Sequence, residues 1–365
     1  MLFPFIDLKT LHKEIHPELQ EAVDSLLGSS SFIMGDAVDA FEREMREYTG
    51  CDYALGVDSG TRALELIYRA LGIGPGDEVI TSPFSFVATT SSILQVGATP
   101  VFADVDPETM NIDPEEVKKK ISSATRAITP VHLFGKMADL ERLQQVAGAI
   151  PLIEDACQAI GGRNAAAAVG GVGMAAALSF FPTKNLGGAG DGGMVLTNDA
   201  KLARGISRLR NHGQDADGLV GEPGCTGRLD ALQAAFLRVK LTYLDSWISR
   251  RRENAHWYLD NLPSVTVAQT PEPGHVYHQF TIRIPERDAV RRELTAKGIP
   301  TAVYYSRPIH LQPLFSRSGY GAGDLPQAES LSREVLSLPV GPCLCVANRQ
   351  RIVEELKSVL EQMGY

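Results

Sequence analysis

The feature that most constrains the fold is an alternation of two kinds of segment between about Tyr53 and Asn198. Short apolar runs are followed by longer amphipathic stretches, such as residues 61–71 and 114–121. Near-continuous apolar strands that alternate with helices predict a mainly parallel sheet covered on both faces. The strands that we expect are residues 53–58, 78–82, 100–105, 126–132, 151–155, 176–181 and 193–198. The gap before the last strand is short enough for a hairpin, which would make one strand antiparallel.

This pattern changes after residue 228. Residues 228–262 resemble a long connecting helix, either straight or kinked. The rest of the chain mixes apolar extended runs with helical patterns, which predicts a smaller α+β domain. The runs are residues 275–284 and 299–305, and the helical patterns are residues 286–298, 326–337 and 347–363. A chain of 365 residues is long enough for two domains. We therefore expect a large domain over residues 1–247, including an N-terminal arm, and a small domain over residues 248–365.

The charge balance and the cysteines exclude several classes of protein. The net charge is −9, and the basic cluster at residues 248–252 is isolated, which argues against nucleic acid or anionic membranes as partners. No apolar run approaches the roughly 20 residues of a membrane helix, and the first ten residues lack a signal-peptide pattern. The five cysteines form no metal-ligand pattern and no disulfide framework. We expect a cytoplasmic protein without a metal site.

Residues able to bind a ligand gather at the ends of the predicted strands, where open α/β sheets bind their ligands. They are Ser59, Gly60, Thr61, Phe84, Ser85, Phe86, His132, Glu154, Asp155, Ser179 and Lys184. Because they come from several segments, the predicted sheet would bring them to one edge.

Several of these residues allow two interpretations. Residues 59–61 open a helix, so they either bind an anion at its N-terminus or only cap it. Phe86 is either an aromatic surface for a ligand or part of the core. Asp155 ends an apolar strand and needs a cation nearby, either a protonated pyridine nitrogen or an arginine.

Lys184 favours the ligand-binding interpretation. It lies in a segment of small residues, "LSFFPTKNLGGAGDGG" at residues 178–193. Burial would lower the pKa of this lysine and make it a nucleophilic amine. A buried lysine, a helix N-terminus for phosphate, a strand-end aspartate and an aromatic surface together form the set that holds pyridoxal phosphate.

The chain resembles the DegT/DnrJ/EryC1/StrS family of pyridoxal-phosphate-dependent sugar aminotransferases. The similar segments are residues 59–64, 76–106, 130–135, 153–161, 178–193, 210–213, 228–241 and 298–312. The resemblance implies the aspartate aminotransferase fold, also called fold type I. This α/β fold has a large domain, with a mostly parallel seven-stranded sheet flanked by helices, and a smaller C-terminal α+β domain. It also implies a homodimer.

The resemblance implies a role for each residue at the cofactor ring. Lys184 would carry the covalent link to the cofactor and act as the catalytic base. Asp155 would pair with the pyridine nitrogen. Gln158 would approach the phenolic oxygen, and Phe86 would stack on the ring.

The resemblance also implies the residues around the ring. Gly60, Thr61 and Ser179 would bind the phosphate. Tyr305 and His310, in the segment "YYSRPIH", would lie near the substrate.

The sequence departs from the family pattern at three places. Members commonly carry an asparagine that reaches the phosphate of the partner's cofactor, and Thr226 occupies that position in "GCTGRLD". A threonine hydroxyl is shorter than an amide and has one hydrogen to donate instead of two. Met174 replaces a common aspartate, and the alanine run at residues 165–168 replaces a more polar loop.

The activity that the resemblance implies is transamination. The amino donor would be L-glutamate, and the acceptor a nucleotide-diphosphate-linked keto-sugar with its ketone at C3 or C4. Pyridoxal phosphate would alternate with pyridoxamine phosphate. Two alternatives stay open: a sugar dehydratase using the same cofactor, although such relatives have histidine in place of the lysine, and a non-catalytic regulatory protein that binds pyridoxal phosphate.

Overall fold

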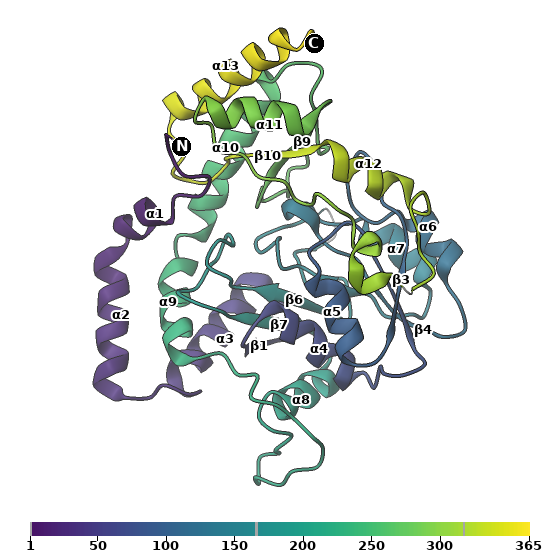
Figure 1. Cartoon of the computed structure of the whole chain (residues 1–365). Coiled ribbons are helices and arrows are strands. Elements are labelled where there is room, and N and C mark those ends of the chain that lie inside the picture. The colour runs from purple at the N-terminus through teal and green to yellow at the C-terminus, as the bar shows by residue number, and fades with distance from the viewer. Residues whose placement is uncertain (1, 165–166, 317) are drawn as a thin grey trace.

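The strands expected between residues 53 and 198 are all present in a computed structural model that describes residues 2–164, 167–316 and 318–365 (Figure 1). Their observed bounds differ from the prediction by at most three residues at either end. They are β1 (Tyr53–Val57), β2 (Glu78–Thr81), β3 (Thr99–Phe102), β4 (Thr125–Thr129), β5 (Ile153–Asp155), β6 (Ala175–Ser179) and β7 (Gly193–Thr197).

Within the described residues these seven strands form one sheet in the order β1–β7–β6–β5–β4–β2–β3. Hydrogen bonding joins β1, β7, β6 and β5 in one group and β3, β2 and β4 in another. The groups meet through parallel bridges between Ile128 and Leu152 and between Val131 and Asp155. β7 is antiparallel to β1 and β6, whereas β2, β3 and β4 pair in parallel, as do β5 and β6. The mostly parallel sheet and its antiparallel strand are thus confirmed.

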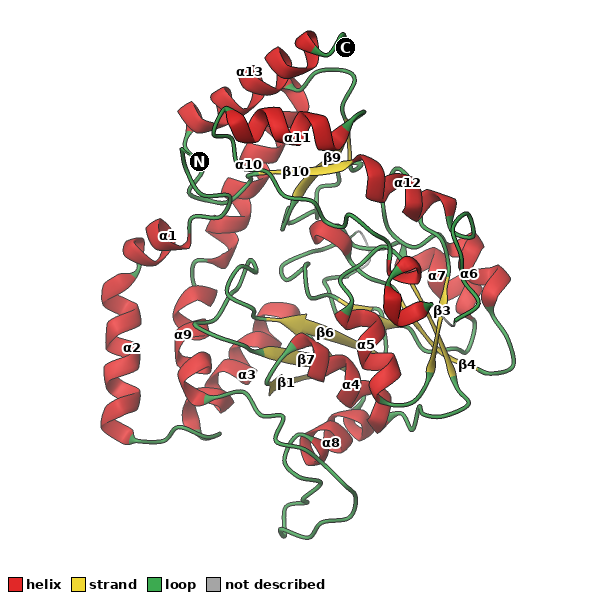
Figure 2. Ribbon diagram, in the orientation of Figure 1, coloured by secondary structure: helices red, strands yellow, loops and turns green. Residues whose placement is uncertain are grey.

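Helices cover both faces of the sheet (Figure 2). One face packs against α3 (Asp36–Thr49), α6 (Pro114–Lys120), α7 (Leu140–Ala147) and α9 (Ala231–Leu241). The other face packs against α4 (Gly60–Ala70), α5 (Ala88–Gln95) and α8 (Ala200–Leu209). Successive strand residues point to opposite faces, so Ala176 joins the first core while Ala175 and Ala177 join the second. The parallel strands direct their carboxyl ends to a common edge, which is the edge that the site occupies.

The long helical run at 228–262 is interrupted. It forms α9 and then α10 (Leu244–Asn261), with the break at Thr242 and Tyr243. The Thr242 hydroxyl donates to the carbonyl of Val239 at 2.8 Å, a local hydrogen bond that competes with regular helix. α10 contributes Trp247 to one apolar cluster and Tyr258 to another, so the proposed domain boundary after residue 247 falls inside this helix.

The C-terminal part has its own apolar cluster around an antiparallel sheet of β8 (Val267–Ala268), β9 (Phe280–Arg283) and β10 (Val335–Leu338). Helices α11 (Arg287–Ala296) and α13 (Val346–Gln362) pack on it with α10. Two expectations for this region were wrong in detail. The helix expected at 326–337 is α12 (Pro326–Glu334), because residues 335–338 pair with β9 instead. Residues 299–305 contribute only a bridge between Ala302 and Ser337.

The N-terminal segment spans both parts of the molecule. The backbone N–H of Leu2 donates to Gly298 of the C-terminal part at 3.1 Å. Helix α1 (Leu8–Glu14) follows, and α2 (His16–Ser29) packs along α9 at the side of the molecule (Figure 1). Of the helices in the described ranges, none combines the length and apolar character needed to cross a membrane.

Candidate active site

A cavity of about 680 Å³ lies at the carboxyl edge of the sheet, between the large sheet and the 303–305 segment. It brings together most of the residues singled out in the sequence: Gly60, Thr61, Phe86, Asp155, Gln158, Ser179, Lys184 and Tyr305. The prediction that several strand ends supply one site therefore agrees with the geometry of the chain.

The N-terminus of α4 forms one end of this cavity. Ser59 caps the helix, because its Oγ accepts from the backbone N–H of Arg62 at 3.1 Å. Gly60 begins the helix, and a Cβ there would lie 2.6 Å from Cys157 Sγ and 3.0 Å from Ser179 Cβ. The capping and anion-binding interpretations are thus compatible: Ser59 takes one N–H, while the first helical N–H groups and dipole remain for an anion beside Thr61 and Ser179.

Asp155 lies on the cavity wall and is only 5% exposed. Its Oδ2 accepts from the hydroxyl of Thr89 at 2.6 Å, and its Oδ1 accepts from the backbone N–H of Cys157 at 3.3 Å. Among the described residues no lysine or arginine forms an ion pair with it, so the arginine alternative finds no support. The carboxylate is placed to meet a cation from a bound ligand.

Lys184 projects into the same cavity from the loop after β6. The backbone of this loop turns tightly, since the N–H of Lys184 donates to the carbonyl of Phe181 at 2.8 Å. Burial lowers the pKa of the Lys184 amine, although the nearby Cys157 and Asp155 oppose the shift. A lowered pKa raises the fraction of neutral amine, the form that acts as a nucleophile or a base.

Gln158, Phe86 and Tyr305 form another wall. Gln158 Oε1 accepts from the backbone N–H of Phe134 at 2.8 Å, and its Nε2 donates to the Tyr305 hydroxyl at 3.4 Å. Burial raises the pKa of Tyr305, so the phenol stays protonated. Phe86 is 56% exposed and its ring lies 6.4 Å from that of Tyr305. The core interpretation of Phe86 is therefore wrong.

Two of the proposed site residues do not line this cavity. His310 is buried, and its Nε2 lies 3.2 Å from Glu329 Oε1. Thr226 is exposed on the segment after α8, and its hydroxyl lies 3.2 Å from His212 Nε2. The substrate contact of His310 and the contact of Thr226 with a partner's cofactor stay predictions. Of the other departures, Met174 is exposed, and residues 165–166 of the alanine run lie outside the described residues.

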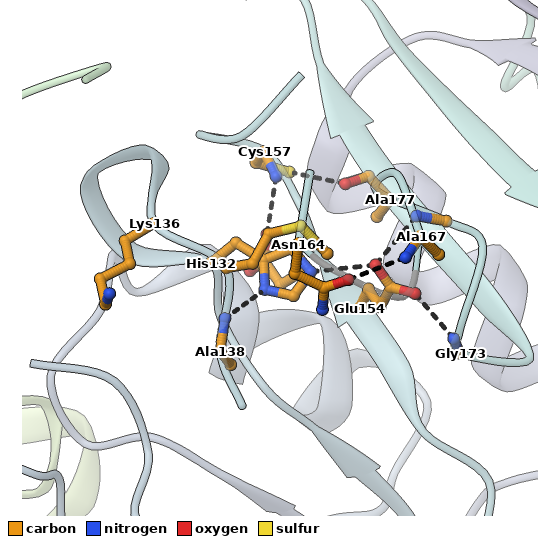
Figure 3. Close-up of polar contacts among 12 residues, drawn as sticks. His132, Lys136, Ala138, Glu154, Cys157, Asn164, Ala167, Gly173 and Ala177 are labelled. Carbon is orange, nitrogen blue, oxygen red and sulfur yellow. Dashed lines mark hydrogen bonds and ion pairs between the residues drawn. The ribbon is translucent and has the colours of Figure 1, made fainter. Parts of the chain in front are cut away.

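His132 and Glu154, also at the strand ends, do not line the cavity, and they bind each other (Figure 3). Consecutive residues of β5 face opposite sides of the sheet, which separates Glu154 from Asp155. His132 Nδ1 accepts from the N–H of Ala138, so its Nε2 carries the proton and donates to Glu154 at 2.9 Å. Burial would raise the pKa of Glu154, but His132 and the N–H groups of Gly170 and Gly173 together lower it. This pair holds the 170–173 loop in place.

Several residues of the cavity and its surroundings were not predicted from the sequence. Cys157, Asp191, His278 and Gln279 line the cavity, and Thr89 lies behind Asp155. Burial lowers the pKa of His278 well below its usual range, and Lys184 adds to the effect, so this imidazole is neutral. Thr89 lies at the start of a helix, where threonine is ordinary. His278 comes from a distant segment, with no local signal.

The donor set of this cavity fits pyridoxal phosphate. The glycine at the start of α4 leaves no room for a side chain, as close approach of a phosphate to the backbone requires. At the other end the buried carboxylate of Asp155 forms no ion pair with the part of the chain that the structure describes, and a lysine with a lowered pKa lies in the same cavity.

Comparison with known proteins agrees with the fold. The family model described as the DegT/DnrJ/EryC1/StrS aminotransferase family matches residues 13–357. A pleiotropic regulatory protein of Geobacillus stearothermophilus is 43% identical over 364 residues, covering 98% of each chain. A dTDP-3-amino-3,4,6-trideoxy-alpha-D-glucose transaminase of Streptomyces venezuelae is 40% identical and covers 99% of this chain and 97% of its own.

A solved structure shows the same architecture. The crystal structure of DesV from S. venezuelae, in complex with a ketimine intermediate, superimposes with a TM-score of 0.94 at 40% identity, covering 97% of each chain. The fold and the lysine-containing cavity thus define an aminotransferase of fold type I. The chain belongs to the DegT/DnrJ/EryC1/StrS aminotransferase family.

Proposed function

We propose that this protein transfers an amino group from L-glutamate to carbon 3 of a nucleotide-diphosphate-linked keto-sugar, using pyridoxal phosphate. The S. venezuelae relative, named as a dTDP-3-amino-3,4,6-trideoxy-alpha-D-glucose transaminase, supports a sugar nucleotide as the substrate class and carbon 3 as the position. The ketimine intermediate of the DesV structure supports a keto group in the acceptor, because a ketimine forms when an amine condenses with a ketone and water is lost. The segments "SPFSFVATT" and "RNHGQ" also resemble members that act at carbon 3.

One observation carries the proposal: Lys184, with a lowered pKa, shares one cavity with Asp155, which forms no ion pair within the described residues. When bound, pyridoxal phosphate supplies an electron sink for the bond broken at the amino-bearing carbon. Lys184 would carry the proton between that carbon and the cofactor, as a general base and then as a general acid. Asp155 would hold the pyridine nitrogen in its protonated form. Gly60, Thr61 and Ser179 would hold the phosphate, and Phe86 would stack on the ring.

Tyr305 is placed to orient the substrate. It borders the cavity, it stays protonated, and its hydroxyl already accepts from Gln158. His310 would lie near the substrate without lining the cavity, with its imidazole held by Glu329.

The first test is Lys184→Ala. Wild-type protein given pyridoxal phosphate should develop a visible absorbance band that glutamate bleaches. Lys184→Ala should lack that band and lose at least about 10³-fold in amino transfer, because both the anchor and the base are removed. Lys201→Ala, on the exposed face of α8, is the matched control and should behave as wild type. A Lys184→Ala protein with an unchanged band would show that the assignment is wrong.

The second test separates the alternatives. Protein charged with glutamate should be supplied with a panel of nucleotide-linked 3-keto and 4-keto sugars, and the product identified by mass spectrometry. A 3-amino sugar supports the proposal. Loss of water without amino transfer indicates the dehydratase. Binding of pyridoxal phosphate without turnover of any donor or acceptor indicates a regulatory protein, the description carried by the Geobacillus relative.

A further inference from the structure

The first turn of α5 holds a side chain that touches Asp155 from behind. Thr89 is 1% exposed, and its Oγ1 lies 2.6 Å from Asp155 Oδ2. The two residues are 66 positions apart in the sequence, so this contact depends on the packing of α5 against the strand ends. The other carboxylate oxygen has a weaker anchor, the N–H of Cys157 at 3.3 Å.

The direction of the Thr89 hydrogen bond follows from its neighbours. Its single hydroxyl hydrogen can reach Asp155 Oδ2 at 2.6 Å or the carbonyl of Phe86 at 3.2 Å. The carboxylate is the nearer and stronger acceptor, so Thr89 donates to Asp155. The hydroxyl of Ser85, 3.0 Å from Thr89 Oγ1, then donates to Thr89. Ser85 borders the cavity, so an ordered chain runs from the cavity wall to the carboxylate.

Thr89 also belongs to the turn that carries Phe86. The backbone N–H of Thr89 donates to the carbonyl of Phe86 at 3.3 Å. One residue therefore connects two groups proposed to contact the cofactor ring: the carboxylate at its nitrogen and the aromatic ring on its face.

We propose that Thr89 is a positioning residue that fixes the orientation of Asp155 relative to Phe86 and thereby sets the affinity for pyridoxal phosphate. The inference rests on the proposed function only through the cofactor and does not depend on which sugar is the acceptor. It predicts that the affinity for pyridoxal phosphate depends on the hydroxyl of Thr89 and not on its methyl group.

The test compares Thr89→Val, which keeps the shape and removes the hydroxyl, with Thr89→Ser, which keeps the hydroxyl. The neighbouring Thr90→Val is the matched control, because Thr90 Oγ1 is buried without a hydrogen-bond partner in the part of the chain that the structure describes. The dissociation constant of pyridoxal phosphate is measured by fluorescence titration, and the absorbance of the loaded protein is recorded against pH. Circular dichroism and melting of the cofactor-free protein report folding.

Loss of a hydrogen bond to a charged group predicts that Thr89→Val weakens cofactor binding about 10- to 100-fold and shifts the pH profile of the absorbance. Thr89→Ser should stay within about 3-fold of wild type, and Thr90→Val should match wild type. If Thr89→Val does not fold, Thr89→Ala replaces it. In an Asp155→Ala background the Thr89 substitution should have no further effect on the dissociation constant.

The proposal is overturned by Thr89→Val protein with wild-type affinity and pH profile, by an equal loss in Thr90→Val, or by a full additional loss in the Asp155→Ala background. These outcomes differ from a failure of the proposed function, in which wild-type protein itself would not bind the cofactor or would not exchange its amino group with glutamate.

Discussion

At the scale of single residues, the absence of a side chain at Gly60 matters as much as the presence of one at Lys184. Gly60 packs between Cys157 and Ser179, at the point where α4 begins. Its φ angle is not in the left-handed region, so backbone freedom does not explain the glycine. Space does, because the helix N-terminus can approach the end of β6 and a bound phosphate only without a Cβ.

Gly60→Ala should therefore weaken cofactor binding by at least about tenfold and lower the free energy of unfolding by about 1–3 kcal/mol, because the added Cβ overpacks this contact. Titration with pyridoxal phosphate and urea unfolding of the cofactor-free protein measure the two effects. Gly28→Ala, in the exposed part of α2 where a Cβ meets nothing within 4 Å, is the control. It should leave binding unchanged and stabilise the protein by about 0.5–1 kcal/mol. Equal binding by both variants would contradict the role of Gly60.

The two residues that the sequence identifies most clearly share one property: their type is unusual for their local pattern. A lysine among glycines and a carboxylate at the end of an apolar strand both stand out, and Lys184 and Asp155 do meet in the cavity. Thr89 and His278 do not stand out, because threonine near a helix start and histidine before a strand are ordinary. The error in grouping Glu154 with Asp155 came from counting strand-end residues without assigning the face of the sheet to which each points.

At the scale of elements, α9 supplies a lysine that joins three segments. Lys240 is buried, and its Nζ donates to the carbonyl of Gly187, in the loop that carries Lys184. The same Nζ lies 3.5 Å from Nε2 of His12 in α1, and it faces the rings of Phe236 and Trp247. Burial lowers the pKa of Lys240 to about 8. Burial and then Lys240 lower the pKa of His12, so this imidazole stays neutral near pH 8.

The pKa of Lys240 predicts a stability that rises with pH. An unfolded lysine titrates near 10.4, so between about pH 8 and 10.4 the unfolded chain binds more protons at this site than the folded one. The free energy of unfolding of wild type minus that of Lys240→Met should increase by up to about 3 kcal/mol across this range. Urea unfolding of the cofactor-free proteins from pH 7 to 10.5 measures it. Lys184 is common to both proteins and cancels. A difference that stays constant or decreases as the pH rises would rule out this interpretation.

At the scale of the whole molecule, the alternating pattern predicted the large sheet well because a parallel sheet is buried on both faces. Each of its strands is then an apolar run bounded by polar residues. The C-terminal part was harder, since β10 follows α12 without a break and no glycine or proline at their junction marks the end of a helix. There the pairing of residues 335–338 with β9 overrides the local preference, and such long-range pairing is not visible in the sequence.

Thr226 is the residue through which the assembly of two chains would affect the site. It is exposed and does not line the cavity of its own chain, although the resemblance assigns its position to a partner's cofactor phosphate. If two chains complete each site, the affinity for pyridoxal phosphate must depend on assembly. We expect one affinity for dimers and a lower one after dilution to monomers, measured by fluorescence titration alongside sedimentation.

The substitutions Thr226→Val and Thr226→Asn then separate assembly from direct contact. In the dimer, Thr226→Val should weaken cofactor binding about 3- to 10-fold because it removes the one hydroxyl donor. Thr226→Asn should match or exceed wild type, because its amide reaches further and carries two hydrogens. In diluted monomers the three proteins should bind alike, since the residue does not line the cavity of its own chain. Equal affinities in the dimer as well would mean that Thr226 does not contact the partner's cofactor, and a monomer with full affinity and activity would mean that each chain forms its site alone.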